Sequence, residues 1–265
     1  MPDDNLDIHA RINKLDTSLF DPVFSQTTGG DRRSLLALQS ALAGIKKKYV
    51  YLEIGSYLGG SLQPHAFDPR CEKIFSIDTW PAMQKDERWP AGYKTPESSQ
   101  AKMLDNLKSI GADTAKIICF DRDASGIPKE KITVSPDICF IDGEHTAAKV
   151  LSDFDFCRQV IVPAGLIIFH DANVVFKAIV KILNRLKKDG VKFDAYFLLG
   201  TVFVVSFNPA LDHDPLVLSL RAQMRYEAMR RWIVWSVYPG IVLRCRISSA
   251  LRKLLGLSDH RCLKT

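Results

Sequence analysis

Residues 49–61 constrain the fold of this chain more than any other stretch of its sequence. They begin with the apolar run 49–54, interrupted only by Glu53, and continue into a glycine-rich turn at 55–60. A short β-branched and aromatic run of this kind predicts a buried strand of a parallel sheet. Glycines let a backbone approach a ligand without a Cβ in the way. Open α/β sheets bind ligands at the carboxyl ends of their strands, so this turn is the expected binding site.

The spacing within the turn argues against a dinucleotide site. A dinucleotide fingerprint reads G-x-G-x-x-G, whereas this segment reads E-x-G-x-x-x-G-x-S, with Tyr57 where the second glycine would stand. The segment resembles instead the first motif of class I methyltransferases that use S-adenosylmethionine (SAM). A glycine turn of some other α/β protein is the alternative. The resemblance implies SAM contacts at Glu53, Gly55, Ser56, Gly59 and Ser61.

Later residues fit the same kind of site. The apolar run 73–77 ends at Asp78, 18 residues after the last glycine of the turn. This is close to the offset at which an acid binds ribose hydroxyls in nucleotide-binding βαβ units, and a strand-end turn is the alternative role. After the run 116–120, Asp123 and Ala124 occupy the place that the resemblance assigns to adenine contacts.

Strands and helices alternate along most of the chain. Further strands are expected at 137–141, 165–169, 195–199 and 202–207, the last two as an antiparallel hairpin. This order predicts a doubly wound α/β sheet with right-handed crossovers. It resembles the seven-strand, mostly parallel, Rossmann-like sheet of class I methyltransferases. The predicted domains are an N-terminal arm and helix (1–47), a SAM-binding domain (48–208) and a basic helical extension (209–265).

Two segments outside the predicted sheet have less regular patterns. Residues 1–30 are expected to form an irregular arm, and Asp31 is expected to cap a helix that runs to about residue 44. Residues 81–96 show no clear period and contain three prolines. A loop of this length is usually a lid or binding loop, and a solvated insertion is the alternative.

Four polar residues are expected to meet at the carboxyl edge of the sheet. Asp142 and His145 follow one predicted strand, and His170 and Asp171 follow the next. Carboxylates and an imidazole that converge form a donor set for a divalent metal ion. The alternatives are a helix cap for Asp142, a surface position for His145 and a hydrogen-bonded His170–Asp171 pair without metal.

The sequence around these four residues resembles one branch of the class I enzymes. Runs 140–145 and 163–171 are similar to metal-dependent sugar O-methyltransferases of the macrocin O-methyltransferase kind and to cephalosporin-hydroxylase-like proteins. The resemblance implies metal ligands at Asp142, His170 and Asp171. It also implies that His145 is the general base, and that Asp142 contacts SAM and takes part in catalysis. A glutamate is commoner at the place of His170. Imidazole is a softer ligand, which admits Mn²⁺, Fe²⁺ or no metal beside Mg²⁺.

The net charge of +6 lies entirely in the C-terminal extension. Residues 211–265 carry 10 Lys+Arg and 4 Asp+Glu, which leaves 26 of each for residues 1–210. Apolar and tryptophan residues recur at helical spacing from Asp214 onward, and a second helix is expected after Pro239-Gly240. Basic amphipathic helices with tryptophan suit an anionic membrane surface. The alternative is packing on the main domain or on a second subunit, as in a homo-oligomer.

The remaining features indicate where the chain works. The six cysteines form no C-x-x-C pair, and Cys119 and Cys139 lie in apolar runs, which indicates reduced core thiols. The N-terminus is acidic and lacks the apolar core of a signal peptide. The longest uncharged stretch of the extension, 232–243, is too short to span a bilayer. We therefore expect a cytoplasmic protein, with peripheral contact at the inner membrane face as the alternative to a fully soluble one.

These observations predict a SAM-dependent O-methyltransferase. The expected acceptor is a sugar or another small hydroxylated molecule or glycan, with a divalent cation such as Mg²⁺ or Mn²⁺ as a second cofactor. Nucleic acid is not expected as a partner because the basic excess is absent from the strand edge. The alternatives are a non-catalytic membrane- or partner-binding protein on the same fold and a metal-assisted hydroxylase- or hydrolase-like enzyme.

Overall fold

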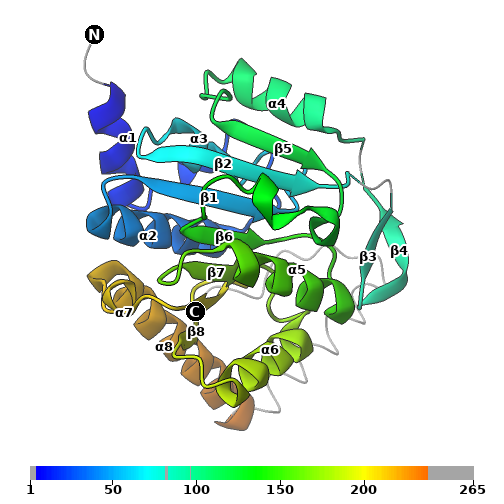
Figure 1. Ribbon diagram of the computed structural model, residues 1–265. Helices are drawn as coiled ribbons and strands as arrows, with labels where there is room; N and C mark the ends of the chain where they lie inside the picture. The colour runs from blue at the N-terminus through cyan, green and yellow to red at the C-terminus, as the bar shows by residue number, and fades with distance from the viewer. Residues whose placement is uncertain (1–3, 81–82, 96, 238–265) are drawn as a thin grey trace, which may run out of the picture. The chain divides into compact units, whose positions relative to one another are not determined.

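A seven-stranded sheet organises the residues that the structure, a computed structural model, describes: 4–80, 83–95 and 97–237 (Figure 1). Its strands are β1 (Tyr49–Ile54), β2 (Cys71–Asp78), β5 (Ile117–Asp121), β6 (Ile138–Ile141), β7 (Leu166–Phe169), β8 (Asp194–Phe197) and β9 (Phe203–Ser206). They lie in the order β5-β2-β1-β6-β7-β9-β8. Strand β9 is antiparallel to β7 and β8, and the other pairs are parallel. The doubly wound sheet and its closing hairpin are confirmed.

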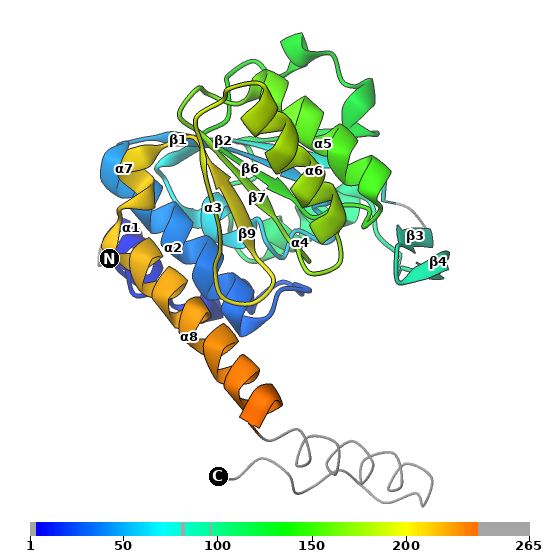
Figure 2. The same cartoon turned by 90° about the horizontal axis from the view of Figure 1, so that it is seen from below.

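Helices cover both faces of this sheet. The helices are α1 (Asp4–Asn13), α2 (Gly29–Ile45), α3 (Gln63–Phe67), α4 (Gln100–Ser109), α5 (Ala147–Val160), α6 (Phe176–Lys188), α7 (Pro209–Asp212) and α8 (Pro215–Val237), with 3-10 turns η1 (Thr17–Phe20), η2 (Ala124–Gly126) and η3 (Lys129–Lys131). Helices α5 and α6 lie on one face, and α2 and α3 lie on the other (Figures 1 and 2). Every residue of β1 is buried, as expected for a strand covered on both faces.

The N-terminal segment is more regular than its sequence predicts. Residues 1–30 contain α1 and η1, and Ile8, Ile12 and Phe20 are buried. The expectation of an irregular arm is therefore wrong, because these side chains give the segment an apolar face to bury. The cap of α2 is also different: the side chain of Thr28 accepts from the Asp31 N–H, and Asp31 accepts from the Thr28 N–H in return.

Residues 81–96 contain a hairpin where a loop was expected. Strands β3 (Met83–Asp86) and β4 (Trp89–Lys94) pair antiparallel, separately from the main sheet. Pro90 and the charged residues of this segment hide the alternation that normally reveals a strand. Figure 1 shows this hairpin beyond the carboxyl ends of the central strands.

The chain divides into two compact units, Met1–Arg221 and Ala222–Thr265. The predicted boundary near residue 208 falls inside the first unit, because Leu211, Val217 and Leu220 are buried. The predicted second helix of the extension lies outside the described residues. Within the described residues no helix is both long and apolar enough to cross a membrane. Cys139 is a buried thiol, whereas Cys119, on the edge strand β5, is only half-buried.

Candidate active site

The carboxyl ends of the four central parallel strands are aligned in one row. Ile54 of β1 pairs with Ile77 of β2 and with Ile141 of β6, and Ile141 pairs with Phe169 of β7. Side chains that come next after this row must therefore share one edge of the sheet. The residues in those positions are Gly55, Asp78, Asp142 and His170.

A cavity of about 340 Å³ opens at this edge. The structure brings most of the predicted site residues to its wall: Gly55, Ser56, Ser61, Asp78, Asp123, Ala124, Asp142 and His145. The other predicted residues, Glu53, Gly59, His170 and Asp171, are not part of the wall. Residues 83–85, from the segment expected to be a lid or binding loop, also line the cavity. Two further parts of the wall, residues 24–26 and Lys149, were not predicted from the sequence.

The glycine turn closes tightly on β6. The φ angle of Gly55 is +96°, and a Cβ on it would lie 2.2 Å from the carbonyl oxygen of Asp142. The Asp142 N–H donates to the carbonyl of Ile54 at 2.8 Å, which fixes this approach. Only glycine fits here, so the turn exposes backbone to the cavity as the first motif predicts.

Asp78 holds the glycine turn from the neighbouring strand. Its Oδ2 accepts from the Tyr57 N–H at 2.8 Å, and its Oδ1 accepts from the Trp80 N–H at 2.7 Å. The Trp80 ring N–H donates to the Tyr57 carbonyl and completes the link. Burial raises the pKa of Asp78, although the N–H donors act in the opposite direction. Asp78 therefore holds the glycine turn in the wall of the cavity.

Glu53 is buried behind the turn, away from the cavity. Its carboxylate accepts from the Tyr51 hydroxyl and from the Ser61 hydroxyl, each at 2.7 Å. Burial outweighs these two hydrogen bonds and raises the pKa of Glu53 to about 8. The structure therefore gives Glu53 a role in tying β1 to the end of the turn, and does not place it at a ligand.

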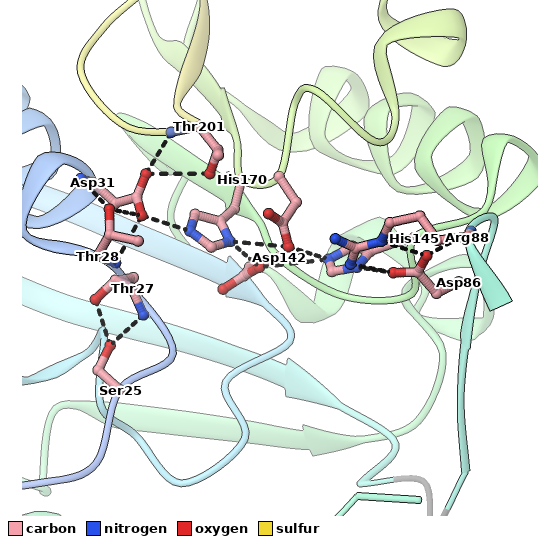
Figure 3. A network of polar contacts seen from close by, with 11 residues as sticks. Ser25, Thr27, Thr28, Asp31, Asp86, Arg88, Asp142, His145, His170 and Thr201 are labelled. Carbon is pink, nitrogen blue, oxygen red and sulfur yellow. Dashed lines mark hydrogen bonds and ion pairs between the residues drawn. The ribbon is translucent and has the colours of Figure 1, made fainter. Parts of the chain in front are cut away.

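An alternating chain of acids and histidines crosses the strand edge (Figure 3). His170 lies between two acids: its Nδ1 is 2.9 Å from Asp142 Oδ1, and its Nε2 is 3.4 Å from Asp31 Oδ2. Burial disfavours a charge on His170, but Asp142 and Asp31 outweigh burial and raise the pKa of His170 to about 11. His170 is therefore an imidazolium held by two carboxylates at neutral pH.

His145 continues the chain on the cavity side. Its Nδ1 lies 3.0 Å from Asp86 Oδ2, and its Nε2 lies 3.9 Å from Asp142 Oδ1 and 3.6 Å from Asp171 Oδ2. Burial opposes protonation of His145, but its acidic neighbours, Asp142 first, raise its pKa. The Nε2 atom is buried and has no hydrogen-bond partner. This nitrogen therefore has unused hydrogen-bonding capacity beside Asp142 and Asp171.

Two acids of this network were not predicted as site residues. Asp31 was expected only as a helix cap, yet its Oδ1 also accepts from the Thr201 N–H at 2.7 Å, and its Oδ2 faces His170. Asp86 lies in the segment expected to be a loop. Its carboxylate accepts from the Arg88 guanidinium, which lowers the pKa of Asp86. No sequence pattern links either acid to a histidine so far along the chain.

The predicted metal ligands come together without forming a metal centre. Among the residues described, no three His, Cys, Asp or Glu side chains are arranged to hold an ion. His170 Nδ1 is 2.9 Å from Asp142 and 3.9 Å from Asp171. Asp31 lies behind His170, where a carboxylate usually supports a metal-bound imidazole. Imidazole and carboxylate are donor types that a divalent ion accepts, and Nδ1 of His170 could serve as a ligand only after its proton leaves.

Comparisons with known proteins agree with this geometry. Residues 52–172 match the family model described as "Methyltransferase domain", a little under half of the chain. A protein of Acanthamoeba polyphaga mimivirus, described only as uncharacterized, is 25% identical over 126 residues. The match covers 48% of this chain and 52% of that protein, so the chain matches about half the length of this curated relative.

Two solved structures share the architecture. The O-methyltransferase NovP has a TM-score of 0.54 and 10% identity, over 70% of this chain and 83% of that one. The calicheamicin methyltransferase CalS11 has a TM-score of 0.50 and 13% identity, over 78% and 93%. At such identities they establish the common fold. Residues 52–172 are therefore similar to a methyltransferase domain, and the chain shares the fold of these two methyltransferases.

Proposed function

We propose that this enzyme transfers the methyl group of SAM to an oxygen of a small hydroxylated acceptor, a sugar or a related polyol, with His145 as the general base. One observation carries the proposal. The unpartnered Nε2 atom belongs to a histidine in the wall of the same cavity that contains the glycine turn. A methyl donor bound at the glycine turn would therefore share one cavity with this proton acceptor.

The half of the cavity near β1 and β2 fits the cofactor. Backbone of Gly55 and Ser56 suits the amino-acid end of SAM, which has no phosphate to bind. We assign Asp78 to the ribose hydroxyls, and Asp123 and Ala124 belong to the same wall. These assignments follow the order in which the strands reach the edge.

Other residues of the cavity wall suit a hydroxylated acceptor. They include hydroxyl and amide side chains, which pair with sugar hydroxyls: Ser25, Gln26, Gln84, Thr95 and Ser98. Exposed apolar side chains lie among them, with Phe24 at 62% and Met83 at 47% exposure. NovP, which shares the fold, is described as an O-methyltransferase. We therefore take oxygen as the accepting atom here.

The proposed step balances with the groups present. An acceptor hydroxyl gives its proton to His145 Nε2, and the oxygen attacks the methyl carbon of SAM in line with sulfur. The carbon–sulfur bond breaks, and its electron pair stays on sulfur, so the products are an ether, S-adenosylhomocysteine and an imidazolium. Because the sulfonium is already activated, the enzyme mainly positions the oxygen and removes its proton. A divalent ion at Asp142, His170 and Asp171 would lower the pKa of the acceptor hydroxyls.

Calorimetry and a transfer assay test the proposal. We expect the full chain to bind S-adenosylhomocysteine and to transfer labelled methyl groups from SAM to members of a panel of sugars and polyols. The variant His145→Ala should keep the binding and lose the transfer. An absence of binding at millimolar ligand would contradict the proposal. Binding by wild type with no transfer to any hydroxylated acceptor would favour a non-catalytic protein.

A further inference from the structure

Hairpin β3–β4 is attached to the backbone on both sides of His145. Asp86 forms a parallel bridge with His145. The His145 N–H donates to the Lys85 carbonyl at 3.3 Å, and the Glu87 N–H donates to the His145 carbonyl at 3.1 Å. The Ala147 N–H donates to Glu87 Oε1 at 2.8 Å. The hairpin thus docks as an added strand on the segment that carries the base.

The irregular pairing of the hairpin turns Asp86 inward. The register between β3 and β4 shifts between Gln84 and Asp86. Asp86 is 1% exposed, whereas its neighbours Lys85 and Glu87 are exposed. Burying a carboxylate is costly unless it is paired, and Asp86 is paired with Arg88 on its own hairpin and with Nδ1 of His145.

The same hairpin also forms part of the cavity wall. Met83, Gln84 and Lys85 line the cavity immediately before Asp86. A molecule that contacts these residues therefore contacts the element that supplies the partner of His145. Binding in the cavity and orientation of the histidine ring are mechanically connected.

We propose that Asp86 is a positioning residue for His145, and that docking of hairpin β3–β4 against residues 145–147 brings it into place. This inference rests on the proposed function of His145 as the base. When Asp86 accepts the Nδ1 proton, the neutral ring keeps its lone pair on Nε2, the nitrogen that has no hydrogen-bond partner. Without Asp86 the ring loses its preferred tautomer and orientation.

Two variants of Asp86 separate positioning from folding. Asp86→Ala removes the acceptor, and Asp86→Asn keeps an amide oxygen that can accept from Nδ1. We expect Asp86→Ala to lower kcat about 10- to 100-fold, the usual effect of losing the partner of a functional histidine. Asp86→Asn should recover part of that loss. The dissociation constant for S-adenosylhomocysteine should stay within about threefold, as in the exposed control Glu130→Ala.

A spectroscopic measurement tests the inference without any turnover. In protein labelled with ¹⁵N at histidine, NMR reports the tautomer of each ring, and the signal missing from His145→Gln identifies His145. We expect neutral His145 to be the Nδ1–H tautomer. Asp86→Ala should shift it toward the Nε2–H tautomer. Glu87→Ala, which loosens docking but keeps Asp86, should speed hydrogen exchange at the amides of Glu87 and His145 and lower kcat.

The outcomes distinguish this inference from the proposed function. An unchanged tautomer in Asp86→Ala, or a loss of cofactor affinity equal to the loss of kcat, would overturn the positioning role. A wild-type protein that shows the tautomer but transfers no methyl group would overturn the proposed function and leave the Asp86–His145 pairing intact.

Discussion

The carbonyl oxygen of Asp142 occupies the space that a side chain on Gly55 would need. A Cβ there would lie 2.2 Å from that oxygen, and the φ angle of +96° disfavours any other residue. We expect Gly55→Ala to destabilise the protein by at least about 2 kcal/mol and to abolish binding of S-adenosylhomocysteine. Chemical denaturation and calorimetry measure the two effects.

Gly190→Ala is the matched control for this change. Gly190 also has a positive φ, +67°, but nothing lies within 4 Å of a Cβ built on it. It should lose only about 1 kcal/mol of stability and bind the ligand normally. Equal losses of stability and binding in the two variants would mean that the close approach of Asp142 is not the reason why position 55 requires glycine.

Asp78 should contribute to cofactor affinity through the turn and through the ribose. We expect Asp78→Asn to weaken binding of S-adenosylhomocysteine about tenfold, because a charged acceptor is replaced by a neutral one. Asp121→Asn is the control, since Asp121 is the exposed register partner of Asp78 on β5 and does not line the cavity. Equal affinities in the two variants would exclude a ribose contact at Asp78.

The sheet could be predicted because its signals are local. Each central strand is a short apolar run that ends in a polar residue, and helices with clear apolar faces separate the runs. Since parallel strands end at one edge, the convergence of Asp78, Asp142 and His145 followed from strand order alone. That part of the site was predictable from the sequence, and the wall of the cavity confirms it.

The partners of the two histidines were not predictable in the same way. Asp31 and Asp86 reach His170 and His145 from α2 and β3, through contacts that only the folded chain makes. The place of Glu53 was not predictable for a different reason. Its sequence position suggests a ligand contact, but in β1 its side chain points toward the hydroxyls of Tyr51 and Ser61. The direction in which a strand side chain points depends on packing, and a sequence motif alone does not show it.

The pH dependence of turnover should report on His145. The base must be neutral to accept a proton, and the neighbouring acids raise the pKa of His145 above its ordinary value of 6.5. We therefore expect kcat/KM to fall as the pH falls, with its midpoint on the alkaline side of 6.5. His145→Gln should lose about 100-fold or more in kcat and should lack this limb of the profile. An unchanged limb in the variant would assign the titration to another group.

Glu53 should make stability depend on pH. Its pKa is raised from 4.5 to about 8, so the folded protein holds a proton that the unfolded chain releases. The stabilising effect of that proton is complete below 4.5 and disappears as the pH rises to about 8. We expect the Tm of the wild-type protein to fall as the pH rises from about 5 to about 9. The drop should be smaller in Glu53→Gln, which stays neutral.

Two comparisons complete that test. Glu130→Gln changes an exposed acid and should keep the wild-type pH dependence. Because Glu53 does not line the cavity, Glu53→Gln should bind S-adenosylhomocysteine within about threefold of wild type. A much larger loss of affinity would restore the role at the cofactor that the motif predicts for this residue.

The proton on His170 should reveal whether a metal ion binds beside it. With a pKa of about 11, His170 is protonated at neutral pH, and a metal ion can use Nδ1 only after that proton leaves. We expect Mn²⁺ to bind with release of a proton, measured by calorimetry in buffers of different ionisation enthalpy, and more tightly as the pH rises. The variant His170→Glu supplies a carboxylate instead of an imidazolium. Metal binding by this variant should release no proton from position 170 and should favour Mg²⁺. If protein treated with a chelator keeps full activity and Mn²⁺ gives no heat of binding, then Asp142, His170 and Asp171 work as an ion-pair network without metal.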